Sequence, residues 1–395
     1  MSNLFDHSRL SADLVSGLQE VDRPIEQARG LPSSCYIDPD GELFERRQLF
    51  HRSWACIGFA KDLPKAGDAR PIEFAGRPLL LLRTREGEIR VFENVCRHRG
   101  MALASEPTRF KHVIRCPYHS WCYEHSGELK VTPHVGGPGH NTHDAIDRSS
   151  LALTKIRSAV WWDLIFVDLS GEAEPFEDYI APLEQRWGEF AFDRLVHGGP
   201  SASFTLEVGC NWKLAVENYC ESYHLPWVHP GLNSYSRLED HYDIIEENRF
   251  SGQGTRVYRP MLTDDGARFP AFEGLSSKWD AGAEYVALYP NLLLGIHRDH
   301  AFAIQLEPKA VDRTLEHVAI YYVGEAALGD AYGEMRRRMG VLWRGVFEED
   351  IFAVEGMQKG RHAPSFDGGR FSPAMDGSTH AFHRWVARRL RGEPA

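Results

Sequence analysis

Four residues that can bind a metal occur as two cysteine–histidine pairs. Cys96 stands two positions before His98, and Cys116 stands three positions before His119. Two thiolates and two imidazoles suit either a zinc ion or an iron–sulfur cluster. Zinc fingers usually group two cysteines and then two histidines, whereas here each pair supplies one of each. A Rieske 2Fe–2S cluster needs that order, because one iron takes both cysteines and the other takes both histidines. The pattern favours a Rieske cluster, and a structural zinc ribbon is the alternative.

A second candidate metal site lies between Asn211 and Pro230. Apolar residues recur there at helical spacing, and Pro226 is expected to end a helix at about residues 211–225. His229 follows one short turn later, so it can converge on a metal together with His224. For His224 alone, a solvated polar face is the alternative. The polar face of this helix carries Glu217, Asn218, Glu221 and His224.

Asp350 is the candidate third ligand of this second site. We expect a helix over about residues 331–358, and a helical wheel surrounds Asp350 with apolar residues only. A lone carboxylate in a buried apolar stripe is costly unless it is paired or binds a cation. With His224 and His229 it would form the 2-His-1-carboxylate triad of non-haem Fe(II). A buried salt bridge is the alternative for Asp350. On the same wheel Glu348, Glu349 and Glu355 point elsewhere and look solvated.

The hydrophobic pattern predicts two domains and an N-terminal segment that would position these residues. Residues 46–158 have a strand-and-turn texture and predict a small all-β domain around the cysteine–histidine pairs. Residues 159–395 predict strands followed by helices, and therefore an α+β domain whose antiparallel sheet is covered by helices. Residues 1–45 are expected to form a helical segment that packs on this larger domain.

Composition restricts the possible partners and the cellular location. The 395 residues carry a formal net charge of −11, which argues against binding to nucleic acid or to an anionic membrane. No apolar run approaches the length of a transmembrane helix, and the N-terminal residues lack a secretory signal pattern. The seven cysteines are scattered and odd in number, which is a poor disulfide framework. We therefore expect a cytoplasmic protein that uses some cysteines as metal ligands.

With both sites in view, residues 45–360 resemble the catalytic (α) subunit of the Rieske non-haem iron oxygenases. The resemblance rests on Cys96 to His119 and on the order His224, His229 and then a distant Asp350. It implies a helix-grip catalytic domain, one Rieske 2Fe–2S cluster, one mononuclear Fe(II) and O₂ as co-substrate. The other interpretation is a non-catalytic electron-transfer or binding protein. It would not explain why the Asp350 carboxylate lies among apolar residues.

The resemblance also implies how electrons reach the iron. The family forms a cyclic homotrimer in which a carboxylate bridges a Rieske histidine of one subunit to an iron-ligating histidine of the next. Glu221 holds that position here, with His119 as its expected partner, and Asn218 is expected to shape the iron pocket. The chain has no G-x-G-x-x-G dinucleotide motif and no flavin pattern. NAD(P)H is therefore expected to act through a separate flavin/iron–sulfur reductase, with or without a ferredoxin.

The sequence says less about the substrate. Glu221, where ring-hydroxylating members have Asp, is similar to members that oxidise quaternary ammonium compounds, so we expect hydroxylation beside nitrogen with N-demethylation. Hydroxylation of an aromatic ring by a mono- or dioxygenase is the alternative, and a zinc hydrolase with a zinc ribbon is the alternative of another class. His297 and His300, on adjacent expected strands, are candidates for the pocket wall. Candidate aromatic residues for a cation cage are Trp212, Tyr219, Trp227, Tyr235, Tyr285 and Tyr289.

Overall fold

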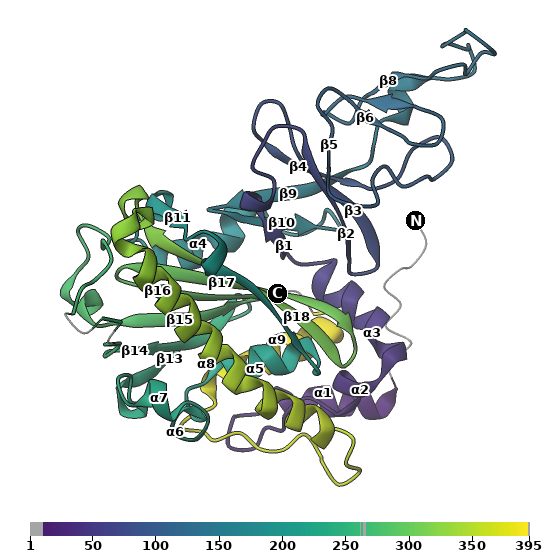
Figure 1. Ribbon diagram of the computed structural model, residues 1–395. Coiled ribbons are helices and arrows are strands. Elements are labelled where there is room, and N and C mark those ends of the chain that lie inside the picture. Colours follow the sequence, from purple (N-terminus) through teal and green to yellow (C-terminus); the bar gives the residue numbers. More distant parts are fainter. Residues whose placement is uncertain (1–10, 261, 264–265, 394–395) are drawn as a thin grey trace. The chain divides into compact units, whose positions relative to one another are not determined.

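The computed structural model describes residues 11–260, 262–263 and 266–393, and the chain divides into two compact units (Figure 1). The smaller unit is Phe50–Ala173. The larger unit combines the described residues of Met1–Leu49 with those of Glu174–Ala395. Each of the two candidate metal sites lies within one unit, so each unit can be described by itself.

The smaller unit is built from two antiparallel sheets, as counted over the described residues. The larger sheet has the order β1 (Ala55–Phe59), β10 (Leu164–Asp168), β9 (Lys155–Trp161), β4 (Ile89–Glu93), β3 (Arg77–Arg83), β2 (Asp68–Phe74) and β5 (Thr108–Arg109). The smaller sheet consists of β6 (Ile114–Arg115), β7 (Cys122–Tyr123) and β8 (Leu129–Val131). Buried side chains of both sheets, among them Leu80, Phe92 and Tyr123, form one apolar cluster that also includes Cys96 and Cys116.

The expected boundary between residues 158 and 159 is wrong. Strand β9 runs through it, and β9 pairs with β10 from Leu164↔Trp161 to Asp168↔Arg157. Strand β10 in turn pairs with β1, the first strand of the smaller unit. A boundary at residue 158 would therefore cut a hairpin whose two strands share one sheet. The apolar residues 160–169 form the end of β9, a turn and β10 rather than one strand, and pairing assigns both strands to the smaller unit.

The larger unit has an antiparallel sheet with helices packed on it, so the predicted α+β class is confirmed. Among the described residues the strand order is β11 (Leu195–His197), β18 (Arg313–Val323), β17 (His300–Ala310), β16 (Leu292–His297), β15 (Ala283–Leu288), β14 (Phe250–Thr255) and β13 (His241–Glu246), and β12 (Ser203–Val208) also pairs with β18. The helices are α1 (Ala12–Val21), α2 (Ser34–Ile37), α3 (Pro39–Glu45), α4 (Phe176–Arg186), α5 (Trp212–Cys220), α6 (Leu225–Val228), α7 (Pro230–Asn233), α8 (Gly333–Gly360) and α9 (Gly377–Leu390).

Three helices pack on the sheet near the candidate iron ligands, and one of them, α8, carries Asp350. On α5, the Tyr219 hydroxyl donates a 2.8 Å hydrogen bond to the carbonyl of Leu294 in β16. On α8, Phe347 packs edge-to-face on Phe302 of β17. Helix α9 is fixed to β14 because the Ser378 hydroxyl donates to the Gly252 carbonyl at 2.6 Å. Figure 1 shows α5, α8 and α9 against the sheet.

The helix expected over residues 211–225 is shorter than the pattern predicts. It begins after Asn211, whose side chain accepts from the Lys213 amide, and it ends at Cys220. Glu221 is extended, with φ −120° and ψ 161°. His224 therefore lies outside the helix, directly before the short helix α6. Helix α8 covers the expected 331–358 segment with small shifts at both ends.

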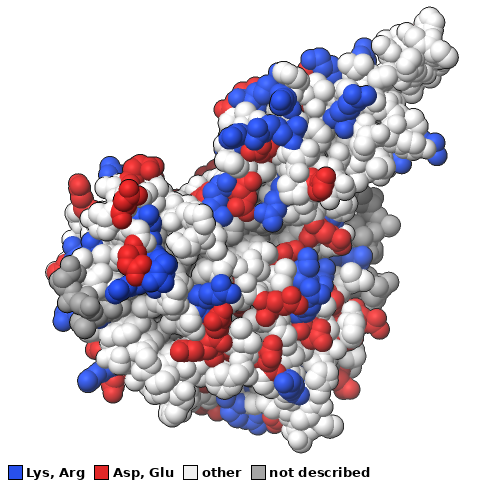
Figure 2. All heavy atoms as spheres, viewed as in Figure 1, with Lys and Arg blue, Asp and Glu red and all other residues white. Residues whose placement is uncertain are grey.

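The outside of the molecule carries both signs of charge. Lys and Arg side chains are interspersed with Asp and Glu on the face drawn in Figure 2. In the described part of the chain, every helix is too short or too polar to cross a membrane.

Candidate metal centres

The two cysteine–histidine pairs lie on two loops with the same backbone pattern. In the first loop, the Cys96 amide donates to the Met101 carbonyl at 2.8 Å and the Gly100 amide to the Cys96 carbonyl at 3.1 Å. In the second, the Cys116 amide donates to the Trp121 carbonyl at 2.9 Å and the Ser120 amide to the Cys116 carbonyl at 3.1 Å. The fourth residue after each cysteine has a positive φ, 74° in the first loop and 59° in the second, which closes the turn. The two loops therefore present their cysteine and histidine side chains on the same backbone geometry.

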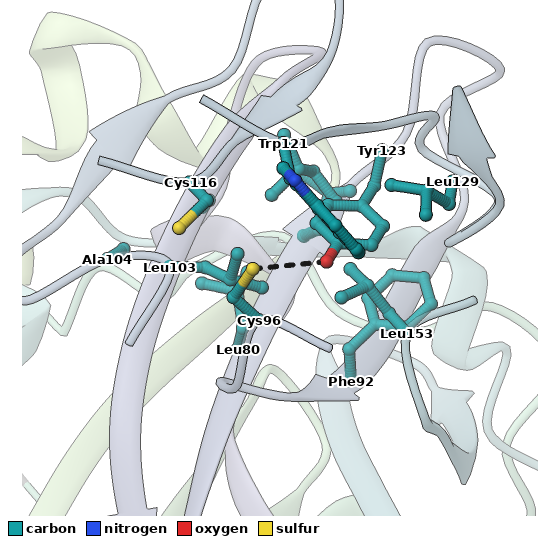
Figure 3. Packing of buried hydrophobic residues seen from close by; sticks show 13 residues of the cluster. Leu80, Phe92, Cys96, Leu103, Ala104, Cys116, Trp121, Tyr123, Leu129 and Leu153 are labelled. Atoms are coloured by element: carbon teal, nitrogen blue, oxygen red, sulfur yellow. Dashed lines mark hydrogen bonds between the residues drawn. The ribbon is translucent and has the colours of Figure 1, made fainter. Parts of the chain in front are cut away.

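The cysteines lie beneath the histidines. Cys96 and Cys116 are buried in the apolar cluster shown in Figure 3, next to Trp121 and Tyr123. His98 is exposed and His119 half-buried, and their ring centroids are 4.6 Å apart. The His98 ring stacks on Trp121 at 4.6 Å. One pair of buried sulfurs and one pair of solvent-facing imidazoles is the donor arrangement that a 2Fe–2S cluster with two cysteine and two histidine ligands requires.

The four ligand atoms do not gather around one point. Among the described residues, the one set of three or more such side chains whose ligand atoms all lie within 4.8 Å of one another is His224, His229 and Asp350. The ligands of a single tetrahedral zinc ion, bound at about 2.0–2.3 Å, would fall within that limit. The loop geometry therefore fits a group larger than one ion.

Tyr123 donates to one of the sulfurs. Its hydroxyl accepts from the Arg97 amide at 3.0 Å and lies 3.1 Å from Sγ of Cys96, the contact drawn as a dashed line in Figure 3. Since the hydroxyl accepts from an N–H, its own proton is available for the sulfur. Burial raises the pKa of the Cys96 thiol, so a positively charged group has to be bound to keep the thiolate in this apolar site.

His224, His229 and Asp350 form the second site. Nε2 of His229 lies 3.0 Å and Nε2 of His224 lies 3.7 Å from Oδ1 of Asp350. Two ligands at right angles, each about 2.1 Å from a metal, lie about 3 Å apart. The three side chains therefore converge as one face of an octahedral site requires, and the histidines both present Nε2. Burial alone would lower the pKa of His229, but the carboxylates of Asp350 and Glu349 raise it, so the site attracts positive charge.

A carboxylate behind each histidine orients its ring. Nδ1 of His224 lies 2.6 Å from Oε1 of Glu221, and Nδ1 of His229 lies 2.7 Å from Oε2 of Glu349. Metal-binding histidines commonly donate the second ring N–H to a carboxylate, which leaves the other nitrogen free for the metal. Glu349 is 47% exposed, as expected of a solvated residue, but the expectation that it points away from the site is wrong. The sequence analysis missed this contact because a helical wheel describes the faces of one helix and not its contacts with other segments. The available signal was that a metal-binding histidine such as His229 usually needs a carboxylate behind its second ring nitrogen.

Asn218 contacts the third ligand directly. Its amide Nδ2 donates to Oδ1 of Asp350 at 2.7 Å, from α5 to α8. The Asp350 side chain is 22% exposed, so the expectation of a fully buried carboxylate is wrong. Glu217, expected on the same polar face, instead lies in the core, where Arg361 donates to it at 3.2 Å. Because the helix ends at Cys220, Glu221 does not lie on the helical face that carries Asn218.

Glu221 stabilises the turn that carries His224. Its Oε2 accepts from the backbone amides of Tyr223 and His224, the latter at 3.2 Å, while Oε1 faces the His224 ring. The carboxylate thus acts as a cap for the chain after α5 and as the orienting partner of a candidate ligand. It is 14% exposed, so it can be reached from outside the chain.

Aromatic side chains surround a cavity of about 50 Å³ beside the triad. Of the aromatic residues expected to form a cage, Tyr219 and Tyr285 line this cavity. Trp227 is 70% exposed, and Trp212 and Tyr289 are buried in other packing contacts. The other aromatic walls are Phe302, Trp343 and Phe347, and the last two belong to the apolar residues that the helical wheel places around Asp350. His297 and His300 lie on β16 and β17 as expected and line a second cavity instead.

Comparison with known proteins identifies both domains. Residues 193–392 match the family described as ring hydroxylating alpha subunit (catalytic domain), and residues 53–144 match the Rieske [2Fe-2S] domain. The chain is 27% identical over 381 residues to the carnitine monooxygenase oxygenase subunit of Escherichia coli K12, covering 95% of this chain and 96% of that one. It is 27% identical over 387 residues to the chloroplastic choline monooxygenase of Arabidopsis thaliana, covering 93% and 84%. Naphthalene 1,2-dioxygenase from Rhodococcus has the same fold, with a TM-score of 0.75 and 19% identity over 98% of this chain and 100% of that one.

Proposed function

We propose that this chain, which belongs to the family of ring-hydroxylating oxygenase α subunits and carries a Rieske [2Fe-2S] domain, is a terminal oxygenase that hydroxylates a small quaternary or tertiary ammonium compound beside its nitrogen. The family uses a 2Fe–2S cluster, a mononuclear iron and O₂. We assign Cys96, His98, Cys116 and His119 to the cluster and His224, His229 and Asp350 to the iron.

The lining of the iron cavity carries the ammonium assignment. Among the described residues that form it, five are Tyr, Phe or Trp and none is Lys or Arg. A cation over an aromatic face gains about 0.5–2 kcal/mol, so two or three such contacts select a cation over a neutral molecule of the same shape. The E. coli and Arabidopsis relatives are named for carnitine and choline, both ammonium compounds.

Each residue of the site has a defined part in the reaction. When bound, the cluster supplies electrons one at a time and the iron supplies open coordination positions at which O₂ is reduced. Glu221 and Glu349 orient the two histidines, and Asn218 holds Asp350 in place. The aromatic walls exclude water and hold the ammonium group beside the metal ligands. An N-methyl group, O₂, two electrons and two protons give N–CH₂OH and water, and the carbinolamine then releases formaldehyde and the demethylated amine.

The chain depends on partners for electrons. Members of this family work with a separate reductase, and the two electrons of each turnover would come from NAD(P)H through such a protein. We further propose a homotrimer in which Glu221 connects His224 to His119 of a neighbouring subunit. The partial exposure of His119 and of Glu221 supports this proposal, because both ends of the connection can be reached from another chain.

The proposal is tested by turnover assays with two substrate panels. The purified protein, a surrogate reductase and NADH are incubated with betaines and choline, and separately with aromatic acids. We expect substrate-coupled NADH oxidation and formaldehyde with the ammonium compounds, and neither with the Asp350→Ala variant. Coupled oxidation with the aromatic acids alone would reject the ammonium assignment in favour of ring hydroxylation. A colourless protein with zinc and no acid-labile sulfide would reject the oxygenase itself in favour of a zinc hydrolase.

A further inference from the structure

Two rings that line the iron cavity each have an imidazole next to their polar atom. The rings are Trp343 and Tyr285. Nε1 of Trp343 donates to Nε2 of His300 at 3.2 Å. The Tyr285 hydroxyl lies 3.2 Å from Nε2 of His297. The two imidazoles are stacked on each other with their ring centroids 4.0 Å apart, and both are buried. An indole and a phenol, the side chains that are most easily oxidised beside the thiols, thus each contact a group that can take up a proton.

The hydrogen bonds around His300 determine where its proton lies. An indole N–H can only donate, so Nε2 of His300 is the acceptor and the ring carries its own proton on Nδ1. That Nδ1 lies 2.6 Å from Oδ1 of Asp299, whose side chain is 19% exposed. If Nε2 receives a proton from Trp343, the carboxylate of Asp299 stabilises the imidazolium that results. The three side chains are therefore arranged to take a proton from the indole.

His297 has the same relation to Tyr285. Burial, followed by the neighbouring His300, lowers the pKa of His297 well below its usual range, so its ring is neutral. The Tyr285 hydroxyl has His297 as its one acceptor among the described residues, so its proton points to Nε2. A phenol that has lost an electron is a strong acid, and even a weakly basic imidazole accepts its proton. Tyr285 can therefore be oxidised without leaving a positive charge on its ring.

Another phenol of the same cavity lacks such a partner. Tyr219 also lines the cavity, and its hydroxyl donates to the backbone carbonyl of Leu294 at 2.8 Å. A backbone carbonyl accepts a hydrogen bond but does not take up the proton. Oxidation of Tyr219 would therefore leave a charged ring in an apolar cavity, which is costly. The contrast distinguishes Trp343 and Tyr285 from an aromatic ring that serves in packing alone.

The electron requirement of the oxygenase reaction gives these pairs a purpose. Complete reduction of O₂ takes four electrons, of which two come from NAD(P)H and two from the C–H bond of the substrate. When no substrate occupies the cavity, the last two electrons have to come from another donor. The side chains that line the cavity are the nearest candidates, and the histidine ligands themselves are among them.

We propose that Trp343 with His300 and Tyr285 with His297 are two proton-coupled redox pairs, which supply these two electrons and so protect the histidine ligands from oxidation. The indole loses one electron as its N–H proton moves to His300, and the phenol loses one electron as its O–H proton moves to His297. Hydrogen peroxide, which is O₂ already reduced by two electrons, takes up these two electrons and two protons from water to give two molecules of water. Two further electrons from NAD(P)H, delivered by the reductase, restore both rings, and the imidazoles return their protons.

Rapid-freeze electron paramagnetic resonance of the holoenzyme mixed with hydrogen peroxide tests this proposal. We expect an organic radical signal in the wild type. Ring-deuterated tryptophan and ring-deuterated tyrosine, incorporated in separate preparations, should each narrow one component of it. Trp343→Phe should lose the tryptophan component, and Tyr285→Phe should lose the tyrosine component. The absence of a radical from the wild type, or components that survive both substitutions, would overturn the inference.

His300→Gln tests the role of the imidazole, because it leaves Trp343 in place and offers its N–H an acceptor that cannot take up the proton. The tryptophan radical, expressed per mononuclear iron, should decrease at least about tenfold, since a positioned base typically contributes about 10²–10⁴-fold. An unchanged yield would mean that His300 only packs against the indole and would overturn the proton-coupled pair.

Two further variants locate the origin of the oxidation. Tyr219→Phe should keep both components of the radical signal, because its hydroxyl has only a carbonyl as acceptor. Asp350→Ala, which should lack mononuclear iron, should give neither component. Loss of the tyrosine component in Tyr219→Phe would contradict the assignment to Tyr285, and a radical of full yield in Asp350→Ala would show that the oxidation does not begin at the iron.

Mass spectrometry measures the protective role. With the reductase, NADH and repeated additions of hydrogen peroxide, the peptide that carries His224 and His229 should become oxidised several-fold faster in Trp343→Phe than in the wild type. Equal rates would overturn that role. The inference rests on the oxygenase reaction and not on the class of substrate. Radical formation without turnover of ammonium compounds would reject the ammonium assignment alone, and turnover without a radical would reject this inference alone.

Discussion

Nδ1 of His229 and Oε2 of Glu349 lie 2.7 Å apart, although the carboxylate belongs to the residue next to Asp350 on α8. Neighbouring positions of one helix thus serve the same histidine, Asp350 from the Nε2 side at 3.0 Å and Glu349 from the Nδ1 side. On the other histidine, Glu221 takes the same place behind Nδ1 of His224. Each of the two candidate histidine ligands is therefore fixed in its tautomer by a carboxylate.

Glu349→Ala should lower the affinity for mononuclear iron about 10–100-fold, because His229 loses the acceptor that holds its Nδ1–H. Iron content after dialysis against a graded series of chelator concentrations measures this effect. Glu348→Ala is the control, since Glu348 pairs with Arg344 at 2.8 Å on the surface of the same helix. Equal iron retention by the two variants would contradict the role given to Glu349.

Asp350→Ala should keep the visible spectrum of the 2Fe–2S cluster and lose both the mononuclear iron and turnover. The two sites lie in separate units, each with its own core, so removing a ligand in one leaves the other intact. Metal analysis, acid-labile sulfide and absorption spectra of one preparation measure all three quantities. Loss of the cluster spectrum together with the iron would show that the units are not independent.

Tyr123→Phe should keep the cluster and lower its reduction potential. The hydroxyl donates to Sγ of Cys96, and a donor stabilises the more negative, reduced state of the cluster. A hydrogen bond that is stronger by about 1 kcal/mol in that state corresponds to about 40 mV for a one-electron couple. Protein-film voltammetry measures the shift. Tyr118→Phe, which changes an exposed ring, should leave the potential unchanged.

Glu221→Gln should slow electron transfer between the cluster and the iron. The change removes the charge that faces His224 and places an amide N–H where Oε2 now accepts from backbone amides. Stopped-flow spectroscopy of the chemically reduced protein with substrate and O₂ measures cluster reoxidation, expressed per mononuclear iron. We expect a decrease of at least about tenfold. Reoxidation at the wild-type rate would reject the connection through Glu221.

Glu316→Gln should stabilise the larger unit increasingly as the pH rises. Burial, and then the charge of Asp350, raise the pKa of the Glu316 carboxyl to about 8. Above about pH 4.5 the unfolded chain releases this proton while the folded chain keeps it, so the wild type loses stability up to about pH 8. Glutamine has no proton to release, and its advantage should grow by at most about 1.4 kcal/mol per pH unit.

Urea unfolding of both proteins, depleted of mononuclear iron, at pH 5, 6, 7 and 8 measures this difference. The sign is opposite to that of a salt-bridged carboxylate, whose contribution is lost on acidification. A stability difference that stays constant from pH 5 to pH 8 would contradict a raised pKa of Glu316.

The ligand types and their order were available from the sequence alone. Cys96, His98, Cys116 and His119 lie close together along the chain, and each pair occupies one loop whose geometry is local. His224 and His229 are similarly close, and Asp350 was found because a helix repeats at a known angle. The α+β class followed from strand and helix periodicity for the same reason. These properties depend on interactions between residues near one another in the sequence.

Pairing and packing between distant segments decided the rest. The helix ends at Cys220 rather than at residue 225 because Glu221 caps the turn that presents His224, which periodicity does not report. Glu349 orients the ring of His229, which lies 120 positions away in the sequence. Strand β10 belongs to the smaller unit because its partners are there. Such contacts arise from tertiary packing, in which burial and hydrogen-bond partners are set by residues far apart in the chain.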